Sequence, residues 1–226
     1  MSILDKHKES VFESEIVSYL TSTQWIEGTS TGYDQELALY PEDLTTYIKT
    51  TQPQAYEKMQ KREGAKTDEV LCQYVAKEMN QHGSLHYLRK EVKYIGSKFK
   101  LCQFKPELHN PDTQAKYDAN ILRVVRQVYY STKNQNSIDL VLFLNGIPIA
   151  TLEIKTDFTQ NVQDAIKQYQ YDRPPRGEPL LSFNKRALVH FAVSNDEVHM
   201  TTKLAGAKTF FLPFNKGKAD GGAGNP

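Results

Sequence analysis

The sequence predicts an α/β domain in which helices flank a mixed sheet. Three observations support this fold class. Residues 8–20 carry apolar side chains at helical spacing, residues 121–155 hold three runs rich in Val, Ile, Leu and Tyr, and residues 159–171 return to helical spacing. The chain has 226 residues, of which 39% are hydrophobic, enough for one sizeable core. We therefore expect one domain over residues 1–219.

The first part of this domain, residues 1–82, is expected to be helical. Residues 8–20 form the first helix, residues 27–35 are rich in Gly, Ser and Thr and predict a loop, and a second helix runs from Pro41 to Ile48. Pro41 favours a helix start because proline needs no hydrogen-bond partner for its nitrogen, and Glu42 and Asp43 favour the positive end of a helix. Residues 54–82 predict one or two surface helices.

The second part, residues 83–214, is expected to form the sheet core. Alternating or continuous apolar patterns predict strands at 87–95, 99–104, 121–130, 138–144, 147–155, 187–193 and 198–202, with a short apolar run at 209–214. Thr159 is a candidate N-cap for the helix that follows Lys155. Residues 220–226 are rich in glycine and predict a flexible tail or linker.

Composition excludes several classes of protein. The 28 Lys and Arg residues against 27 Asp and Glu give a net charge of +1, so no global basic field indicates a nucleic-acid partner. Cys72 and Cys102 lie too far apart in sequence for the spacing of a zinc site and predict two free thiols. No signal-peptide pattern or membrane-length apolar stretch occurs. We expect a cytoplasmic protein with no membrane partner.

Three charged residues stand in the two most apolar strands. Asp139 begins the strand at 138–144, and Glu153 and Lys155 interrupt the strand at 147–155. Burial of a charge is costly unless the charge is paired or binds a metal ion. An internal ion-pair cluster is one explanation. The other is a catalytic centre, in which Asp139 and Glu153 bind Mg²⁺ and Lys155 assists the attacking water or stabilises phosphoryl charge.

This centre depends on the register between the two strands. With a two-residue turn at Asn145-Gly146, Asp139 falls opposite Leu152 and points away from Glu153. With a three-residue loop that contains a bulge, Asp139 falls opposite Thr151, on the face of Glu153. We therefore expect the three-residue loop.

Asp139 together with Glu153-Ile154-Lys155 resembles the PD-(D/E)xK nuclease motif, although Ile138 stands where the motif has proline. Residues 137–155, 33–39, 188–194 and 221–226 are similar to the amino-terminal nuclease region of type I restriction enzyme R (motor/endonuclease) subunits. The resemblance implies a restriction-endonuclease-like fold and Mg²⁺-dependent hydrolysis of double-stranded DNA. It also implies the modification and specificity subunits of the restriction complex as partners.

The family's motor function is not expected in these residues. The sequence contains no GxxxxGK[ST] loop for nucleotide binding. By resemblance, ATP and ATP-driven translocation belong to the full-length subunit and not to this fragment.

The family also has a Gln-x-x-x-Tyr element on the helix after the acid-x-Lys strand. Gln168 occupies this place, but Asp172 stands four residues later where the family has tyrosine, and Tyr169 and Tyr171 lie nearby. The resemblance implies that Gln168 positions the site and contacts DNA, with Tyr171 as a further contact. An ordinary amphipathic helix remains the alternative for both tyrosines.

Further candidates come from the first helix and from a basic segment. Nucleases of this type use an acid from the first helix, and Glu13 borders the apolar stripe of residues 8–20, with Glu15 as the alternative. We include Glu13 among the metal ligands; a solvated carboxylate is the other reading. Arg173 and Arg176, with Lys185 and Arg186, are candidates for phosphate contacts or are solvated loop charges.

A non-catalytic role remains the main alternative. The domain can bind DNA or dock other subunits of the complex, for instance through residues 54–82, without hydrolysing phosphodiester bonds. The complete set of Asp139, Glu153 and Lys155 favours the nuclease.

Overall fold

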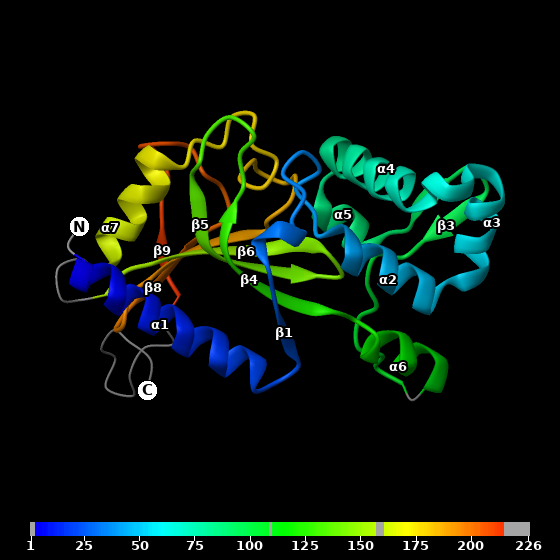
Figure 1. The fold of residues 1–226 in the computed structure, drawn as a ribbon, viewed down its shortest axis with the longest axis horizontal. Helices are drawn as coiled ribbons and strands as arrows, with labels where there is room; N and C mark the ends of the chain where they lie inside the picture. Colours follow the sequence, from blue (N-terminus) through cyan, green and yellow to red (C-terminus); the bar gives the residue numbers. More distant parts are fainter. Residues whose placement is uncertain (1–2, 109, 157–160, 215–226) are drawn as a thin grey trace.

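The computed structural model describes residues 3–108, 110–156 and 161–214, and Figure 1 shows a central sheet with helices around it. The main sheet has seven strands in the order β1-β4-β5-β6-β7-β8-β9. Their bounds are β1 Trp25–Gly28, β4 Leu122–Tyr129, β5 Ser137–Leu144, β6 Ile147–Ile154, β7 Val189–Val193, β8 Val198–Thr201 and β9 Leu212–Pro213. This mixed sheet flanked by helices confirms the expected α/β fold class and is consistent with a restriction-endonuclease-like core.

The sheet combines parallel and antiparallel pairs. β4, β5 and β6 form an antiparallel meander, β1 lies parallel to β4, β7 lies parallel to β6, and β8 and β9 continue antiparallel to the edge. The strands predicted from 121–130 to 198–202 are confirmed, and the short apolar run at 209–214 contains the two-residue strand β9. β1 was missed because its four residues run into the glycine-rich segment that predicted a loop.

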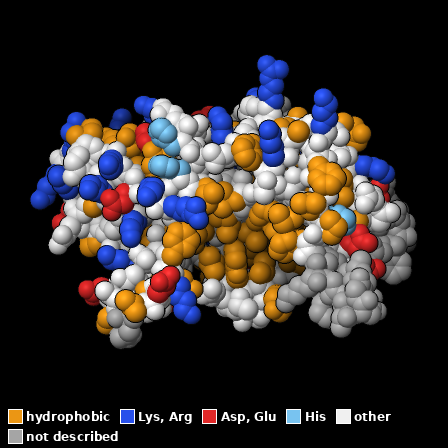
Figure 2. Space-filling view, turned by 180° about the vertical axis from the view of Figure 1, so that it is seen from behind, with side chains coloured by type: hydrophobic (Ala, Val, Ile, Leu, Met, Phe, Trp, Pro, Cys, Tyr) orange, Lys and Arg blue, Asp and Glu red, His pale blue; other side chains and the backbone are white. Residues whose placement is uncertain are grey.

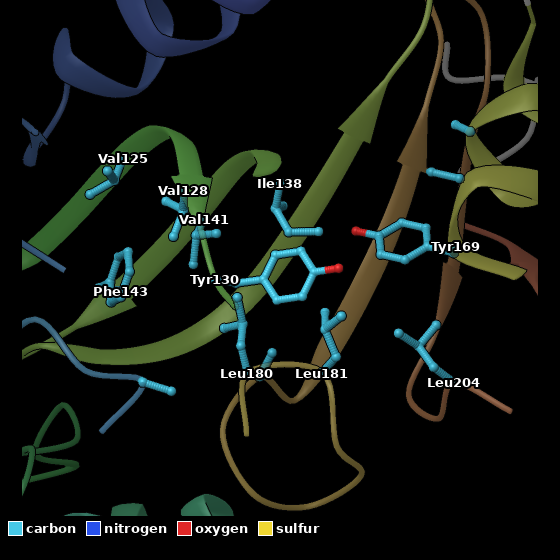
Figure 3. Close-up of a cluster of buried hydrophobic side chains, with 14 of the residues drawn as sticks. Val125, Val128, Tyr130, Ile138, Val141, Phe143, Tyr169, Leu180, Leu181 and Leu204 are labelled. Carbon is cyan, nitrogen blue, oxygen red and sulfur yellow. The ribbon is translucent and has the colours of Figure 1, made fainter. Parts of the chain in front are cut away.

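Two helices cover opposite faces of the sheet. α1 (Ile3–Thr21) buries Val17 against Leu140, Leu152 and their neighbours on one face. α7 (Val162–Lys167) and the π-helical turn η3 (Gln168–Asp172) lie over the other face, where Tyr169 belongs to the same buried cluster as Val141. Since neighbouring residues of a strand point to opposite faces, Leu140 belongs to the core under α1 and Val141 to the core under α7. Figure 3 shows the cluster around Val141, Tyr130 and Tyr169.

A separate helical lobe, residues 41–99, lies at one end of the sheet (Figure 1). It contains α2 (Pro41–Thr51), α3 (Pro53–Glu63), α4 (Thr67–His82), α5 (Ser84–Arg89) and a hairpin of β2 (Val92–Tyr94) and β3 (Ser97–Phe99). These elements share a buried cluster that includes Leu44, Leu71 and Phe99. After the lobe, α6 (Pro111–Asp118) leads into β4, and two short 3₁₀ turns lie at Ser30–Gly32 and Gly64–Lys66.

The strand prediction for residues 87–95 and 99–104 was wrong in part. Residues 84–89 form a helix, and only short strands remain on either side of Ile95 and Gly96, which adopt φ values of 34° and 79°. Two consecutive left-handed residues close a tight turn between antiparallel strands. The hairpin packs in the helical lobe and not in the main sheet. Short alternating runs do not predict this location, because alternation indicates a strand but not the sheet that the strand joins.

The helix after β6 begins later than predicted. Its N-cap is Asn161, whose side chain accepts from the backbone N–H of Gln163, while Asp164 accepts from the backbone N–H of Asn161. Thr159, the predicted cap, and the predicted tail at 220–226 lie outside the described residues.

The two cysteines are separate buried thiols, as predicted. Burial raises the pKa of Cys72 to about 12 and that of Cys102 to about 11, so neither forms a thiolate at neutral pH. Among the residues with described structure, no helix is both long and apolar enough to cross a membrane.

Part of the sheet face that α1 covers remains accessible. Half-buried side chains at its border include Leu142, Val189, Phe191 and Val198. Figure 2 shows apolar side chains across the middle of the molecule, beside the helical lobe with its many lysines and arginines.

Candidate active site

The turn between β5 and β6 has two residues, so the three-residue loop predicted from the sequence was wrong. Asn145 and Gly146 adopt φ values of 49° and 77°, and Leu144 pairs directly with Ile147. A turn with two left-handed residues matches the twist of an antiparallel hairpin. By itself, this register turns Asp139 away from Glu153.

A bulge within β6 restores the geometry. Phe143 pairs with Pro148, whereas Leu142 pairs with Ala150, so Ile149 is an extra residue. Beyond the bulge Leu140 pairs with Leu152, and the next position of this register sets Asp139 opposite Glu153. Proline has no N–H to donate to the ladder, which explains why the irregularity lies beside Pro148.

Contacts to other segments hold the turn at two residues. The buried Asn145 side chain accepts from the backbone N–H of Ile121 at 2.7 Å and donates to the carbonyl of Leu101 at 2.8 Å. The backbone N–H of Tyr40 donates to the carbonyl of Gly146 at 2.8 Å. A Cβ on residue 146 would lie 2.2 Å from the carbonyl oxygen of Tyr40, so only glycine fits this close approach.

A cavity of about 450 Å³ lies where the ends of β5 and β6 meet α1 and η3. It contains predicted site residues from all of these elements, since its lining consists of Glu9, Ser10, Glu13, Gln127, Ser137, Asp139, Ile154, Lys155, Gln168 and Arg173. Figure 1 shows α1 and α7 approaching each other at this end of the molecule. The structure thus brings Glu13, Asp139, Lys155 and Gln168 together.

Glu153 has no exposed surface and does not line the cavity itself, but its partner Arg173 does. Its Oε1 accepts from Nε of Arg173 at 2.7 Å, whereas Oε2 has no hydrogen-bond partner within the described residues. Burial, and then the nearby charge of Asp139, raise the pKa of Glu153 well above the ordinary glutamate value, because both disfavour the ionised form of the carboxyl group. An unpartnered carboxylate oxygen inside a protein is unusual, and this oxygen is therefore a candidate point for binding a ligand.

Asp139 is held by a backbone group of the neighbouring strand. The N–H of Ile154 donates to Oδ2 at 2.8 Å, and Nε2 of Gln127 donates to Oδ1 at 3.3 Å. Charge-assisted hydrogen bonds of this kind fix the direction of a carboxylate.

Lys155 is 7% exposed, and its ammonium group lies inside the cavity lining. Nζ donates to the carbonyl of Ile154 at 3.0 Å and lies 3.2 Å from Oε1 of Glu9. Sequence reasoning missed Glu9, which lies one helical turn before Glu13 and therefore on the same face of α1.

Of the two acids of α1 considered from the sequence, Glu13 lines the cavity and Glu15 does not. Oε2 of Glu13 accepts from Gln127 at 3.0 Å and Oε1 lies 3.7 Å from Arg126, whereas Glu15 is exposed and does not line the cavity. Burial raises the pKa of Glu13, and the hydrogen bond from Gln127 opposes this shift. The role of Glu13 as a metal ligand stays a prediction.

Gln168 begins the π-helical turn η3 and lines the cavity. Its Oε1 is buried and has no hydrogen-bond partner among the residues described. Tyr171 is 67% exposed and Arg176 is also exposed, and neither lines the cavity. π-Helical turns occur frequently at functional sites, but their irregular period is invisible to a pattern search based on 3.6 residues per turn.

The predicted basic cluster does not form as a surface. Arg173 is buried and pairs with Glu153, and Arg186 is fully buried, where its guanidinium donates to the carbonyl of Leu37 and to Asn80. The prediction that Arg186 contacts phosphate was therefore wrong. The sequence shows where charged residues occur. It does not show that the guanidinium group of an arginine is buried and donates hydrogen bonds to carbonyl oxygens inside the protein. Phosphate contacts by Arg173 and Arg176 stay predictions.

The fit of a divalent cation depends on two carboxylates. Within the described ranges, no group of three or more His, Cys, Asp or Glu side chains is preassembled for a metal ion. Asp139 and Glu153 nevertheless face each other across two strands, and Oε2 of Glu153 has a free acceptor site in the described residues. Carboxylate oxygens are the ligands that Mg²⁺ prefers, and it keeps several waters when bound. The residues present fit such an ion.

Comparison with known protein families decides the family. A family model described as type I restriction enzyme R protein N terminus matches residues 14–209, most of the chain. The chain belongs to this family. No curated protein matches the sequence.

Membership in the R protein N-terminal family agrees with the resemblance of residues 137–155 and with the observed fold. The match covers Asp139, Glu153, Lys155 and Gln168, and leaves Glu9 and Glu13 just outside. Gln127 and the ion pair between Arg173 and Glu153 were not expected from the sequence. The partners in that pair are twenty residues apart, and nothing in their spacing indicates contact.

Proposed function

We propose that this chain is the Mg²⁺-dependent endonuclease domain of a type I restriction enzyme R protein, which hydrolyses phosphodiester bonds of double-stranded DNA. One observation carries the proposal: a fully buried carboxylate, Glu153, has an unpartnered oxygen beside Asp139, next to a cavity that also contains an ammonium group. Buried acids with strongly shifted pKa values cluster at functional sites.

In this proposal Asp139 and Glu153 hold the metal ion, with Glu13 as a further acid at the cavity wall. Bound Mg²⁺ supplies polarisation of the phosphodiester and a lower pKa of the attacking water. The N–H of Ile154 keeps Asp139 turned toward the cavity, and Arg173 holds Oε1 of Glu153 so that Oε2 stays available. These contacts preorganise the acids before a substrate arrives.

Lys155 is the candidate that acts on the phosphate or the water. Glu9 and the carbonyl of Ile154 hold its ammonium group in the cavity lining. A fixed positive charge at this place stabilises the negative charge that develops on phosphoryl oxygens in the transition state. Gln168, with an unpartnered side-chain oxygen in the described structure, adds an amide that can orient water or substrate.

The partners of the proposed nuclease follow from the family. We propose double-stranded DNA and the modification and specificity subunits of the complex as partners, and the cytoplasm as the place where the protein acts. Tyr171 and Arg176 are exposed and are proposed to contact DNA, together with Gln168 and Arg173.

Cleavage of supercoiled plasmid tests the proposal. With Mg²⁺ or Mn²⁺, we expect the protein to nick or linearise the plasmid, and the Glu153→Gln, Asp139→Asn and Lys155→Met variants to lose roughly 100-fold or more of the rate. Chelation of the metal should stop the reaction.

A matched control is Glu178→Gln. Glu178 is a buried carboxylate outside the cavity, where it accepts from Ser131 at 2.9 Å, so its replacement removes a buried charge and leaves the proposed centre intact. This variant should cut like the wild type. Cleavage that survives in Glu153→Gln, or that the control loses equally, contradicts the proposal.

The ion pair of Glu153 with Arg173 favours a second candidate function, a DNA-binding or subunit-docking module without hydrolysis. An arginine at 2.7 Å compensates the buried acid without any metal. This candidate predicts that the protein binds DNA and assembles with the other subunits, while plasmid remains intact at all metal concentrations.

A further inference from the structure

Gln127 has a backbone φ angle that is unusual for a residue in a β-strand. It lies within β4 and adopts a φ of 47°, although Arg126 pairs with Leu140 and Val128 pairs with Ile138 on either side in an uninterrupted register. A non-glycine residue with positive φ is strained, and such strain persists where surrounding contacts impose it. The register sets Gln127 opposite Asp139.

The side chain of Gln127 connects two acids of the cavity. Nε2 donates to Oε2 of Glu13 at 3.0 Å and to Oδ1 of Asp139 at 3.3 Å, and Oε1 accepts from the hydroxyl of Ser137 at 3.0 Å. A primary amide has two N–H donors and one acceptor oxygen, so these three contacts engage both N–H groups and the oxygen of Gln127. Ser137 fixes the amide with its nitrogen toward the acids.

This arrangement opposes the repulsion between two carboxylates. Nε2 donates to both carboxylates, so the hydrogen-bond donor of a neutral amide lies between two acids that repel each other. Arg126 adds a positive charge beside Glu13, with NH1 at 3.7 Å from Oε1. The amide therefore fixes how the two acids lie relative to each other.

We propose that Gln127 is a positioning residue, which uses a strained backbone to hold the carboxylates of Glu13 and Asp139 correctly oriented for a divalent cation. The inference rests on the proposed nuclease function and adds a residue outside the motif that suggested it. Gln127 acts through the two acids and need not touch the metal ion or DNA.

The Gln127→Gly variant separates a positioning role from a structural one. Glycine adopts positive φ without strain, so this variant keeps the backbone and removes only the amide. We expect its urea midpoint to equal or exceed that of the wild type. Its affinity for Mn²⁺, measured by titration calorimetry, should fall by roughly tenfold or more, and the Mn²⁺ concentration that half-saturates plasmid cleavage should rise equally.

Ile95→Gly is the matched control. Ile95 is also left-handed, with a φ of 34°, is 57% exposed and does not line the cavity. This variant should also keep or gain stability, but its Mn²⁺ affinity should not change. The Gln127→Met variant, which keeps the side-chain length without donors, should lose Mn²⁺ affinity like Gln127→Gly.

The outcomes separate this inference from the proposed function. If the wild type binds Mn²⁺ and cuts plasmid while Gln127→Gly binds Mn²⁺ equally well, the positioning role is wrong and the nuclease stands. A loss of stability in Gln127→Gly with unchanged Mn²⁺ affinity shows a structural role and also overturns the inference. If the wild type neither binds Mn²⁺ nor cuts, both proposals fail.

Discussion

Glu153 illustrates how a single buried side chain links stability to the proposed chemistry. Its carboxyl group has no exposed surface, lies near Asp139 and shares one oxygen with Arg173. Removing a charge from water costs free energy, and a binding site is a common reason for a protein to retain such a group. The physical cost should be measurable without any substrate.

The raised pKa of Glu153 predicts a specific pH dependence of stability. Between the ordinary glutamate pKa of 4.5 and the raised value, the folded state binds more protons than the unfolded state, so the free energy of unfolding falls as pH rises. In Glu153→Gln this decline should be smaller. Urea unfolding at several pH values, without metal, measures both slopes, and equal slopes would show that Glu153 is not perturbed.

His190 predicts the opposite dependence. Burial lowers its pKa from 6.5 to about 4, and Nδ1 lies 2.7 Å from the hydroxyl of Thr151. The unfolded state therefore binds a proton first as pH falls, and roughly 2 kcal/mol of stability should be lost between about pH 7 and about pH 5. An NMR titration should find the His190 ring neutral at about pH 5. Protonation near the ordinary value would contradict this.

At this scale, the sequence predicted the residues whose charge conflicts with their surroundings. Asp139, Glu153 and Lys155 stand out because they interrupt apolar strands, and the structure gathers them at one end of β5 and β6. Gln127 could not be found this way, since an uncharged residue in a strand of alternating polarity conflicts with nothing. Its distinguishing feature is a φ angle, which no residue pattern encodes.

The hairpin of β5 and β6 is the element that positions the two acids. In a regular hairpin, the length of the turn alone decides whether Asp139 and Glu153 point to the same face of the sheet. In the structure, a bulge at Ile149 brings them to the same face. The sequence signal for this bulge was Pro148, which cannot donate to the ladder. Proline within a strand permits an irregularity but does not define the pairing register of the two strands. The register of β5 and β6 therefore depends also on how the turn packs against other segments.

Gly146→Ala tests how firmly the turn is fixed. The φ of 77° disfavours any other residue, and the new Cβ would meet the carbonyl oxygen of Tyr40. We expect a loss of about 2 kcal/mol or more in urea unfolding. Gly206→Ala, with a φ of 60° and 3.8 Å between its new Cβ and the nearest atom, the carbonyl oxygen of Gln170, controls for the strain of a positive φ and should cost about 1 kcal/mol. Equal losses would mean that the approach to Tyr40 does not constrain the turn.

The whole molecule consists of a sheet with two covered faces and a helical lobe whose buried cluster also includes Ile147 of β6. The sequence predicted the order of helices and strands well from residue 121 onward, where apolar runs are long. It failed for the hairpin of β2 and β3 and for β1, because short strands carry too little pattern to identify their partners. Tertiary contacts decide these elements.

Hydrogen exchange should reflect this architecture. The amides of β4, β5 and β6 are flanked by strands on both sides and lie between α1 and α7, so they should exchange most slowly, whereas the two-residue edge strand β9 should exchange fast. Exchange measured by mass spectrometry on peptides from each strand checks this order. Slower exchange in β9 than in β5 would contradict the fold.

The central claim is that Asp139 and Glu153 share a divalent cation, and a crystal soaked in Mn²⁺ tests it most directly. The account predicts an anomalous peak within about 2.0–2.6 Å of oxygens from both carboxylates, including Oε2 of Glu153. The absence of a peak between them, at a Mn²⁺ concentration that supports DNA cleavage, would contradict it.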